Sequence, residues 1–199
     1  MLRSYTSSDL VTLANASCGA LSIFACLSYI DDARSRQIWA AFVLPVAALV
    51  LDFFDGYVAR LNPNRQSPFG ADLDSLADIV SFGVAPAVLG YTLGLRGFWD
   101  VLCLTFFVCC GISRLARFNV TSADLTNVET GKVRYFEGTP IPTSILLVMV
   151  MAALFSRSLV GDHFIGGHVE LLFRGFHPFS VLFLISGSLM ISTIRVPKL

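Results

Sequence analysis

Charge is scarce in this chain of 199 residues: only 14% of them are Asp, Glu, Lys or Arg, against about 25% in a typical soluble domain. The 14 basic residues balance the 14 acidic ones, so the sequence lacks the net positive charge that holds nucleic acid. The five cysteines lie in apolar runs without metal-ligand spacing, which excludes a disulfide-framed secreted module. Low-complexity tracts are absent as well, which excludes a disordered chain.

Apolar residues are abundant instead, at 55% of the chain, with a mean hydropathy of +0.71. A soluble globule of this size cannot bury so much apolar surface, whereas a membrane-crossing helix needs about 20 mostly apolar residues. Six uncharged runs approach this length, three of them only if the helix also takes in neighbouring charged residues. They are 10–30, 38–51, 79–95, 101–113, 139–156 and 176–194. The sequence therefore predicts an all-α, polytopic membrane bundle of six transmembrane helices, forming a single domain over residues 1–199.

Six charged residues extend the shorter apolar runs. If the chain weaves up and down, the end of the second run, the start of the third and the end of the fourth lie at one membrane face. Ionisable groups are expensive at that depth, so their convergence indicates a functional site. The residues are Asp52 and Asp55, then Asp74 and Asp78, then Arg114 and Arg117.

The basic residues near the ends of the runs predict the orientation of the bundle. Nine of them lie on the face that carries the aspartates, and five lie on the opposite face. Because positive residues accumulate on the cytosolic side, we expect the acidic cluster to face the cytosol. The histidines, His163, His168 and His177, fall on the opposite face, and we expect no role for them in catalysis.

Two pairs of carboxylates and three very small residues share the facing sides of two neighbouring helices. The stretch that holds them, 52–78, reads DFFDGYVARLNPNRQSPFGADLDSLAD. Residues three and four apart are neighbours on a helix surface, and the members of each set keep this spacing. They are Asp52, Asp55, Gly56 and Ala59 on the first helix, and Gly70, Asp74 and Asp78 on the second.

Four carboxylates in this arrangement suit a hard divalent cation, Mg²⁺ or Mn²⁺ rather than zinc. Two such ions, about 3.5–4 Å apart and bridged by shared carboxylates, form a common clamp for displacement at phosphorus. The small residues leave room for a bulky ligand to approach the backbone. The alternatives are tight helix packing through those small residues, an ion-pair network, and a divalent-cation channel or transporter.

The spacing resembles the signature of the CDP-alcohol phosphatidyltransferases, D-x2-D-G-x2-A-R-x8-G-x3-D-x3-D, which Arg60 completes. Nine residues rather than eight separate Arg60 from Gly70, so one residue is added in the loop and both helical registers stay intact. Three further runs resemble the integral-membrane phosphatidylserine synthase branch of that family, and the third is closer to its eukaryotic members. They are LDSLADIVSFGVAPA (73–87), SRLARFNV (113–120) and FEGTPIPTS (136–144). The resemblance covers residues 9–145 and implies the family's fold, with 52–78 as the catalytic motif.

The resemblance also implies a transferase of phospholipid biosynthesis, which moves the phosphatidyl group of CDP-diacylglycerol to the hydroxyl of L-serine and releases CMP. Two divalent ions, Mn²⁺ or Mg²⁺, would be held by Asp52, Asp55 and Asp74, with Asp78 completing the site and acting as general base. We further expect a homodimer in the endoplasmic reticulum membrane. Sister enzymes that use inositol or glycerol phosphate as acceptor, or an archaeal-type lipid donor, stay open as alternatives.

The predicted substrate contacts follow from residue chemistry and from the resemblance. Those for CDP-diacylglycerol are Asp52, Gly56, Ala59, Arg60, Gly70 and Asn15. Asn15 is polar in an apolar run, and a hydrogen bond to a neighbouring helix is an equal alternative for it. A guanidinium fork matches a carboxylate bidentately, so the predicted serine pocket contains Arg117 and Phe118, together with Arg114. Arg114 could instead bind the donor phosphates or pair with the aspartates.

Overall fold

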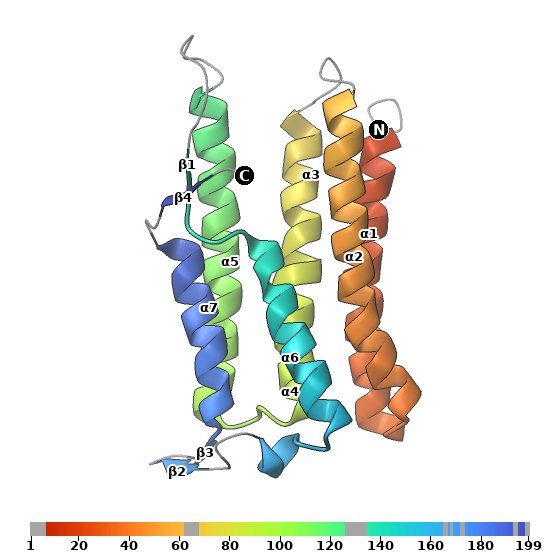
Figure 1. The fold of residues 1–199 in the computed structure, drawn as a ribbon, viewed down its shortest axis with the longest axis vertical. Coiled ribbons are helices and arrows are strands. Elements are labelled where there is room, and N and C mark those ends of the chain that lie inside the picture. The colour runs from red at the N-terminus through yellow and green to blue at the C-terminus, as the bar shows by residue number, and fades with distance from the viewer. Residues whose placement is uncertain are drawn as a thin grey trace.

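The computed structural model describes residues 7–61, 68–125, 135–164, 167, 169–171, 174–192 and 195–197. These residues form a bundle of roughly aligned helices (Figure 1). The α-helices are α1 (Ser7–Asp32), α2 (Ser35–Leu61), α3 (Pro68–Asp78), α4 (Ala85–Leu93), α5 (Phe98–Leu125), α6 (Ile145–Ser156) and α7 (Val181–Ile191). A π-helical segment, Ile79–Val84, joins α3 to α4 without a break.

Two short antiparallel strand pairs lie at opposite ends of the bundle (Figure 1). The strands β1 (Tyr135–Glu137) and β4 (Arg195–Pro197) pair at one end, and β2 (Val169–Leu171) and β3 (Arg174–Phe176) pair at the other. Each strand has three residues, so these pairs tie connecting segments together and form no sheet layer.

Four helical stretches are long and apolar enough to cross a membrane. They are Asp9–Asp32, Ser35–Phe54, Phe69–Leu93 and Phe98–Val120. The last two predicted runs form the shorter apolar stretches Ile141–Ser156 and Pro178–Ile191. Proline lacks an N–H donor, and in both stretches a 3₁₀ turn containing proline comes before the α-helix. The predicted all-α membrane bundle is confirmed, and each of the six apolar runs contains a helix, although Phe176 of the last run belongs to β3.

The helices pack through apolar side chains on their inner faces. Helix α1 runs along α2, and α5 runs along α7. Phe107 of α5 meets Phe183 of α7 edge to face, with ring centroids 5.4 Å apart. Large apolar side chains also point outward: Leu10 and Phe24 of α1 are 69% and 62% exposed. Exposed apolar faces of this kind suit lipid rather than water.

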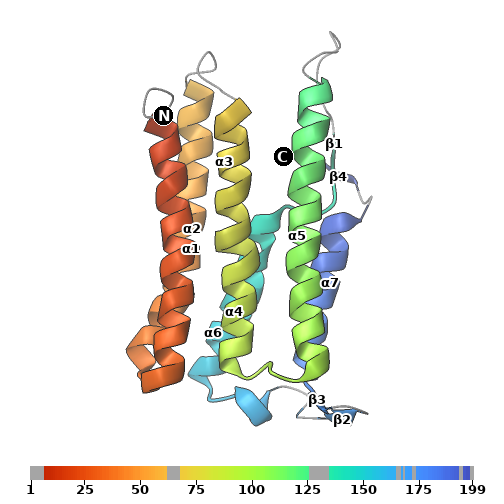
Figure 2. The same ribbon diagram turned by 180° about the vertical axis from the view of Figure 1, so that it is seen from behind.

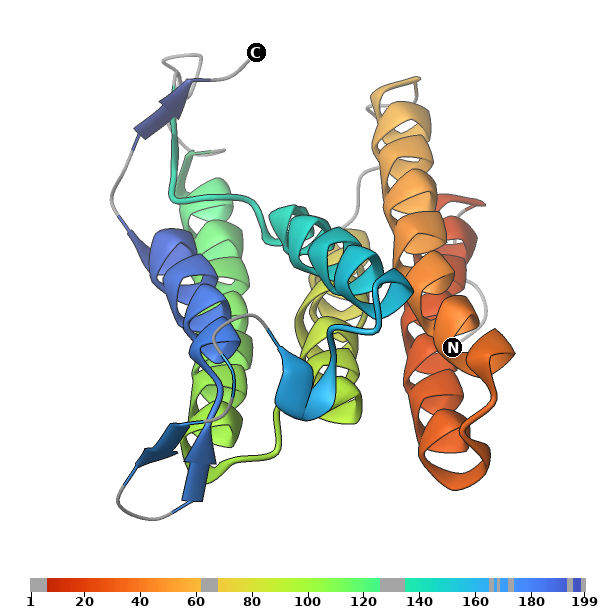
Figure 3. The same cartoon turned by 60° about the horizontal axis from the view of Figure 1, so that its bottom comes forward.

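Helix α6 lies between the α1–α2 pair and the α5–α7 pair (Figure 3). It contacts α2 and α4. Phe155 of α6 packs against Trp39 and Phe42 of α2, with ring centroids 6.0 and 5.8 Å apart. Aromatic contacts of this geometry fix the crossing of the two helices.

Three helix ends meet at one end of the bundle, as the sequence predicts. The end of α2, the start of α3 and the end of α5 all lie at the top of Figure 1, and Figure 2 shows the same from behind. The charged ends of the second, third and fourth apolar runs therefore share one face of the molecule.

Candidate active site

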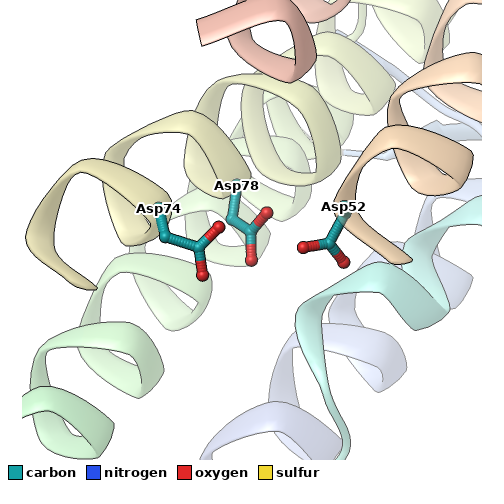
Figure 4. Close-up of side chains that lie close together, drawn as sticks. All are labelled: Asp52, Asp74 and Asp78. Carbon is teal, nitrogen blue, oxygen red and sulfur yellow. The ribbon is translucent and has the colours of Figure 1, made fainter. Parts of the chain in front are cut away.

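Three aspartates from two helices bring their carboxylates together. Asp52 comes from α2, and Asp74 and Asp78 come one turn apart from α3. One oxygen of each carboxylate lies within 4.8 Å of the others, and the three side chains point toward a common centre (Figure 4). Asp78 is only 8% exposed, while Asp52 and Asp74 are half-buried. The predicted convergence of these three residues is confirmed.

The other members of the motif lie on the same two helices. Asp55, Gly56, Ala59 and Arg60 belong to α2, which continues without interruption to Leu61. Their side chains, and the loop 62–67 that carries the extra residue, lie outside the described part of the chain. The proposed place of Asp55 as a fourth ligand therefore stays a prediction. Gly70 lies in the first turn of α3 and is half-buried.

The three carboxylates fit a divalent cation. Two unit charges 4.8 Å apart repel by about 3.5 kcal/mol at an effective dielectric constant of 20, so such a cluster favours a bound cation. Arg114 offsets part of this repulsion, because its charge attracts Asp78. All three converging atoms are carboxylate oxygens, the ligands that Mg²⁺ and Mn²⁺ prefer. The Asp78 carboxylate also contacts α1, so it contributes both to this cluster and to the packing of α3 against α1.

Asn15 of α1 is the contact between α1 and the aspartate cluster. Its side-chain amide donates from Nδ2 to Oδ1 of Asp78, 3.2 Å away, and the residue is 1% exposed. Of the two interpretations that the sequence left open, the hydrogen bond to a neighbouring helix is present in the structure. The contact of Asn15 with CDP-diacylglycerol stays a prediction.

The two arginines of the predicted serine pocket differ in their surroundings. Arg114 is half-buried on α5, and its Nε atom is buried with no hydrogen-bond partner among the described residues. Arg117 and Phe118, three and four residues further along α5, are exposed. Of the two, Arg114 is thus the arginine whose charge attracts Asp78 and whose buried Nε can donate to an anionic group.

The sequence that carries these carboxylates and this arginine matches a known family. The family model for CDP-alcohol phosphatidyltransferase matches residues 5–187 of the chain. The chain belongs to the CDP-alcohol phosphatidyltransferase family. It is 42% identical to the CDP-diacylglycerol–serine O-phosphatidyltransferase of Saccharomyces cerevisiae over 201 positions, which cover 100% of this chain and 72% of that protein.

Other relatives in the CDP-alcohol phosphatidyltransferase family come from bacteria and archaea. The CDP-diacylglycerol–serine O-phosphatidyltransferase of Helicobacter pylori is 38% identical, covering 98% of this chain and 73% of that protein. An archaetidylserine synthase of Methanothermobacter thermautotrophicus is 39% identical over 70% of this chain and 54% of its own length. The names of all three relatives refer to serine, while the lipid differs.

A hydrogen-bonded bridge beside the family motif was missed by the sequence analysis. Asn119 of α5 donates from Nδ2 to Oδ1 of Asp72 on α3, 3.1 Å away. Ser75 of α3 donates to Oδ1 of the same Asn119 at 3.0 Å. The bridge ties the arginine-bearing end of α5 to the helix that carries Asp74 and Asp78. The sequence shows only that a carboxylate and an amide are available for such a bridge. The bonded residues are 44 and 47 positions apart, so helical periodicity does not relate them.

A second group of buried polar side chains lies away from the aspartate cluster. At the opposite end of the bundle, Asp100 at the start of α5 lies 2.7 Å from Nδ1 of His177 and accepts the backbone N–H of that residue at 2.9 Å. Both residues are buried. The pair joins α5 to the segment before α7, so the structure gives His177 a place in packing at the end opposite the aspartates.

Proposed function

We propose that this chain transfers the phosphatidyl group of CDP-diacylglycerol to the side-chain hydroxyl of L-serine, which gives phosphatidylserine and CMP. The observation that carries the proposal is the convergence of Asp52, Asp74 and Asp78 in a chain that matches a serine phosphatidyltransferase over its whole length. A channel filter is a poorer account, because that full-length match is to transferases and because α1 closes directly onto Asp78.

A divalent metal site supports this chemistry. Asp52, Asp74 and Asp78 would hold the cation, with Asp55 as a further ligand, and Mn²⁺ or Mg²⁺ fits their oxygens. Two ions bound there would neutralise the negative charge that develops on the pyrophosphate as CMP leaves. The half-buried position of the carboxylates strengthens their electrostatic interactions relative to those in water.

Asp78 is the proposed general base. The serine hydroxyl is a poor nucleophile at neutral pH, and it needs a group that takes its proton as it attacks. The oxygen of serine forms a bond to the phosphatidyl phosphorus, the bond from that phosphorus to the CMP oxygen breaks, and the proton passes to Asp78. Asp78 suits this role because it is the most buried of the three aspartates and lies at the inner end of α3.

The acceptor pocket is proposed to lie between α3 and α5. The charge of Arg114 attracts Asp78, and its buried Nε is a free donor among the described residues, so its guanidinium would bind the serine carboxylate near the base. Arg117 and Phe118 would form the exposed rim of the same pocket. Inositol has no carboxylate, so an arginine in this place favours serine over inositol. The serine in the relatives' names supports the same acceptor.

The donor is proposed to bind along α2 and the start of α3. Gly56, Ala59 and Gly70 lack bulky side chains and would admit the cytidine and ribose, while Arg60 would meet a phosphate. Asp52 would reach the same nucleotide through the metal. CDP-diacylglycerol is favoured over an archaeal-type lipid because the yeast and Helicobacter pylori relatives named for it match 100% and 98% of the chain, against 70% for the archaetidylserine synthase.

The cellular setting is part of the proposal. The apolar helices indicate a membrane protein. Its similarity to a yeast enzyme favours the endoplasmic reticulum membrane, with the aspartates facing the cytosol. We also propose that the chain forms one catalytic domain over residues 1–199 and acts as a homodimer.

Release of CMP from CDP-diacylglycerol tests the function. Purified protein in detergent receives the donor and Mn²⁺, with serine, inositol or glycerol phosphate added singly. We expect CMP and a new phospholipid with serine alone. Equal turnover with another acceptor would reassign the chain to a sister transferase, and no CMP release with any of them would contradict the enzymatic function.

A further inference from the structure

The side chain of Asn15 lies beside the three aspartates, but it is an amide and not a further carboxylate. The residue sits in the middle of an apolar helix, it is 1% exposed, and its Nδ2 donates to Oδ1 of Asp78 at 3.2 Å. We propose that Asn15 is a positioning residue, which holds the Asp78 carboxylate in the orientation that the metal site needs. The inference rests on the proposed metal-dependent transfer.

Asn15 is itself held in place by the chain segment that follows Asp78. Ser81 is fully buried, and its hydroxyl donates to the backbone carbonyl of Asn15 at 2.9 Å. Asp78 and Ser81 therefore bond to the same residue of α1, one to its side chain and the other to its backbone. The hydrogen bond from Ser81 holds the backbone of Asn15 against the segment that follows Asp78.

A close approach of two backbones makes the double contact possible. A Cβ atom at Gly19 of α1 would lie 2.5 Å from Oγ and 2.7 Å from Cα of Ser81. Any larger residue at this position would push α1 away from the π-helical segment. Gly19 lies one helical turn beyond Asn15, so displacement there would draw the Asn15 amide away from Asp78.

The π-helical segment begins directly after Asp78. Pro86 has no N–H, so the α-helical hydrogen bond to the carbonyl of Phe82 cannot form, which favours a wider turn before the proline. Such π turns often occur at functional sites. Here the wider turn lies between the aspartate pair of α3 and the core packing of α4, and Ser81 anchors it to α1.

Hydrogen bonds from outside the ligand set commonly decide metal affinity. Their partners orient the ligands, and removing one costs about 10–100-fold in metal affinity or activity. Arg114 of α5 attracts Asp78 electrostatically, whereas Asn15 of α1 forms a hydrogen bond with it. Of these two interactions, the hydrogen bond from Asn15 is the directional one.

Direct Mn²⁺ binding tests the inference. Full-length wild-type protein and Asn15→Leu, which keeps the branched shape of the side chain and removes the amide, are titrated with Mn²⁺, and free Mn²⁺ is read by electron paramagnetic resonance. We expect Asn15→Leu to bind Mn²⁺ about 10–100-fold more weakly. At saturating Mn²⁺ its KM for serine should stay near the wild-type value, because Arg114 and α5 are untouched.

Ser22→Ala is the matched control. Ser22 lies on the same helix, is fully buried and donates to the carbonyl of Ala41 on α2 at 2.8 Å, so the variant also loses one buried interhelical hydrogen bond. It should bind Mn²⁺ like the wild type. If it loses as much affinity as Asn15→Leu, the effect is general loosening of α1 and the inference is wrong.

Ser81→Ala is a second variant, which keeps the inference open to test if Asn15→Leu does not fold. It retains the Asn15 amide and loses the anchor, so a smaller loss of Mn²⁺ affinity is expected. If Asn15→Leu folds and binds Mn²⁺ like the wild type, the positioning role is wrong, while the proposed metal site is unaffected. If Asn15→Leu does not fold, wild-type Mn²⁺ affinity in Ser81→Ala has the same meaning. A wild-type protein that binds no Mn²⁺ would instead overturn the proposed metal site, and this inference with it.

Discussion

Asp100 and His177 form a buried pair that closes the end of the bundle opposite the aspartate cluster. One oxygen of Asp100 accepts the backbone N–H of His177, and the other lies 2.7 Å from Nδ1 of the same residue. That second oxygen also accepts the backbone N–H of Gly97 at 3.1 Å. A single carboxylate thus binds the start of α5 to the segment that leads into α7.

Replacing Asp100 with alanine is expected to lower the stability of the protein without changing its chemistry. A buried donor that loses its acceptor costs about 1–3 kcal/mol, and two backbone N–H groups, those of Gly97 and His177, lose the carboxylate that accepts them. Thermal unfolding in detergent measures the loss. Arg34→Ala is the control, because the Arg34–Asp32 pair is exposed and should contribute less than about 1 kcal/mol. Asp100→Ala with wild-type stability would show that the pair contributes nothing.

Much of the aspartate site could be predicted from the sequence, because its information is local. Asp74 and Asp78 are one turn apart on one helix, and up-and-down threading places Asp52 at the same end. The Asp100–His177 pair could not be found in this way. Its members are 77 positions apart, and neither lies in a motif, so only the packing of α5 against the segment before α7 brings them together.

Asn119 provides the second prediction. Its amide bridges α5 to Asp72 and Ser75 of α3, so Asn119→Leu should let the arginine-bearing end of α5 shift relative to the base. We expect the KM for serine to rise several-fold, in line with the loss of about 1–2 kcal/mol of hydrogen bonding. Mn²⁺ binding should change less, because Asp52, Asp74 and Asp78 come from α2 and α3.

Steady-state kinetics with serine and CDP-diacylglycerol varied in turn measures this effect. Ser188→Ala is a suitable control, since Ser188 is an exposed residue of α7 whose hydroxyl donates to the backbone carbonyl of Leu184 in the same helix. An unchanged serine KM in Asn119→Leu would remove the bridge from the acceptor site.

Arg114 carries the third prediction. Lysine keeps the charge but loses the bidentate fork, so Arg114→Lys should raise the KM for serine about tenfold, and Arg117→Lys, at an exposed position, should raise it less. KM values for both substrates separate the possibilities. Arg157→Lys, in the turn after α6, is the control and should behave as wild type. If Arg114→Lys weakens the donor instead of serine, Arg114 belongs to the phosphate site.

The substitution Asp78→Asn distinguishes the proposed role of Asp78 as general base from its proposed role as metal ligand. Asparagine keeps one oxygen for a cation and cannot take a proton, so kcat should fall about 10²–10⁴-fold while CDP-diacylglycerol still binds. Single-turnover CMP release and equilibrium donor binding measure the two effects. Loss of donor binding with the same substitution would make Asp78 a ligand first.

The parts of the site that sequence reasoning missed share one physical origin. Helical periodicity tells which residues share a face, but it does not tell which neighbouring helix that face meets. Asn15 and Asp78 are 63 positions apart, and their contact depends on the close approach of Gly19 to Ser81. The π-helical segment that permits this approach has no periodic signal of its own. Arg114 and Arg117 likewise differ in burial, which their spacing of three residues on one helix does not reveal.

The most direct test of the whole account compares two neighbouring aspartates of α3. Asp74 belongs to the carboxylate cluster, whereas Asp72 is exposed, lies outside that cluster and bonds Asn119 through an oxygen that asparagine would retain. Mn²⁺ binding and serine-dependent CMP release are measured for wild type, Asp74→Asn and Asp72→Asn. We predict that Asp74→Asn loses Mn²⁺ affinity and turnover together, each by at least about 10²-fold, while Asp72→Asn keeps both. Wild-type Mn²⁺ binding and turnover in Asp74→Asn would contradict the metal-dependent transfer proposed for this chain.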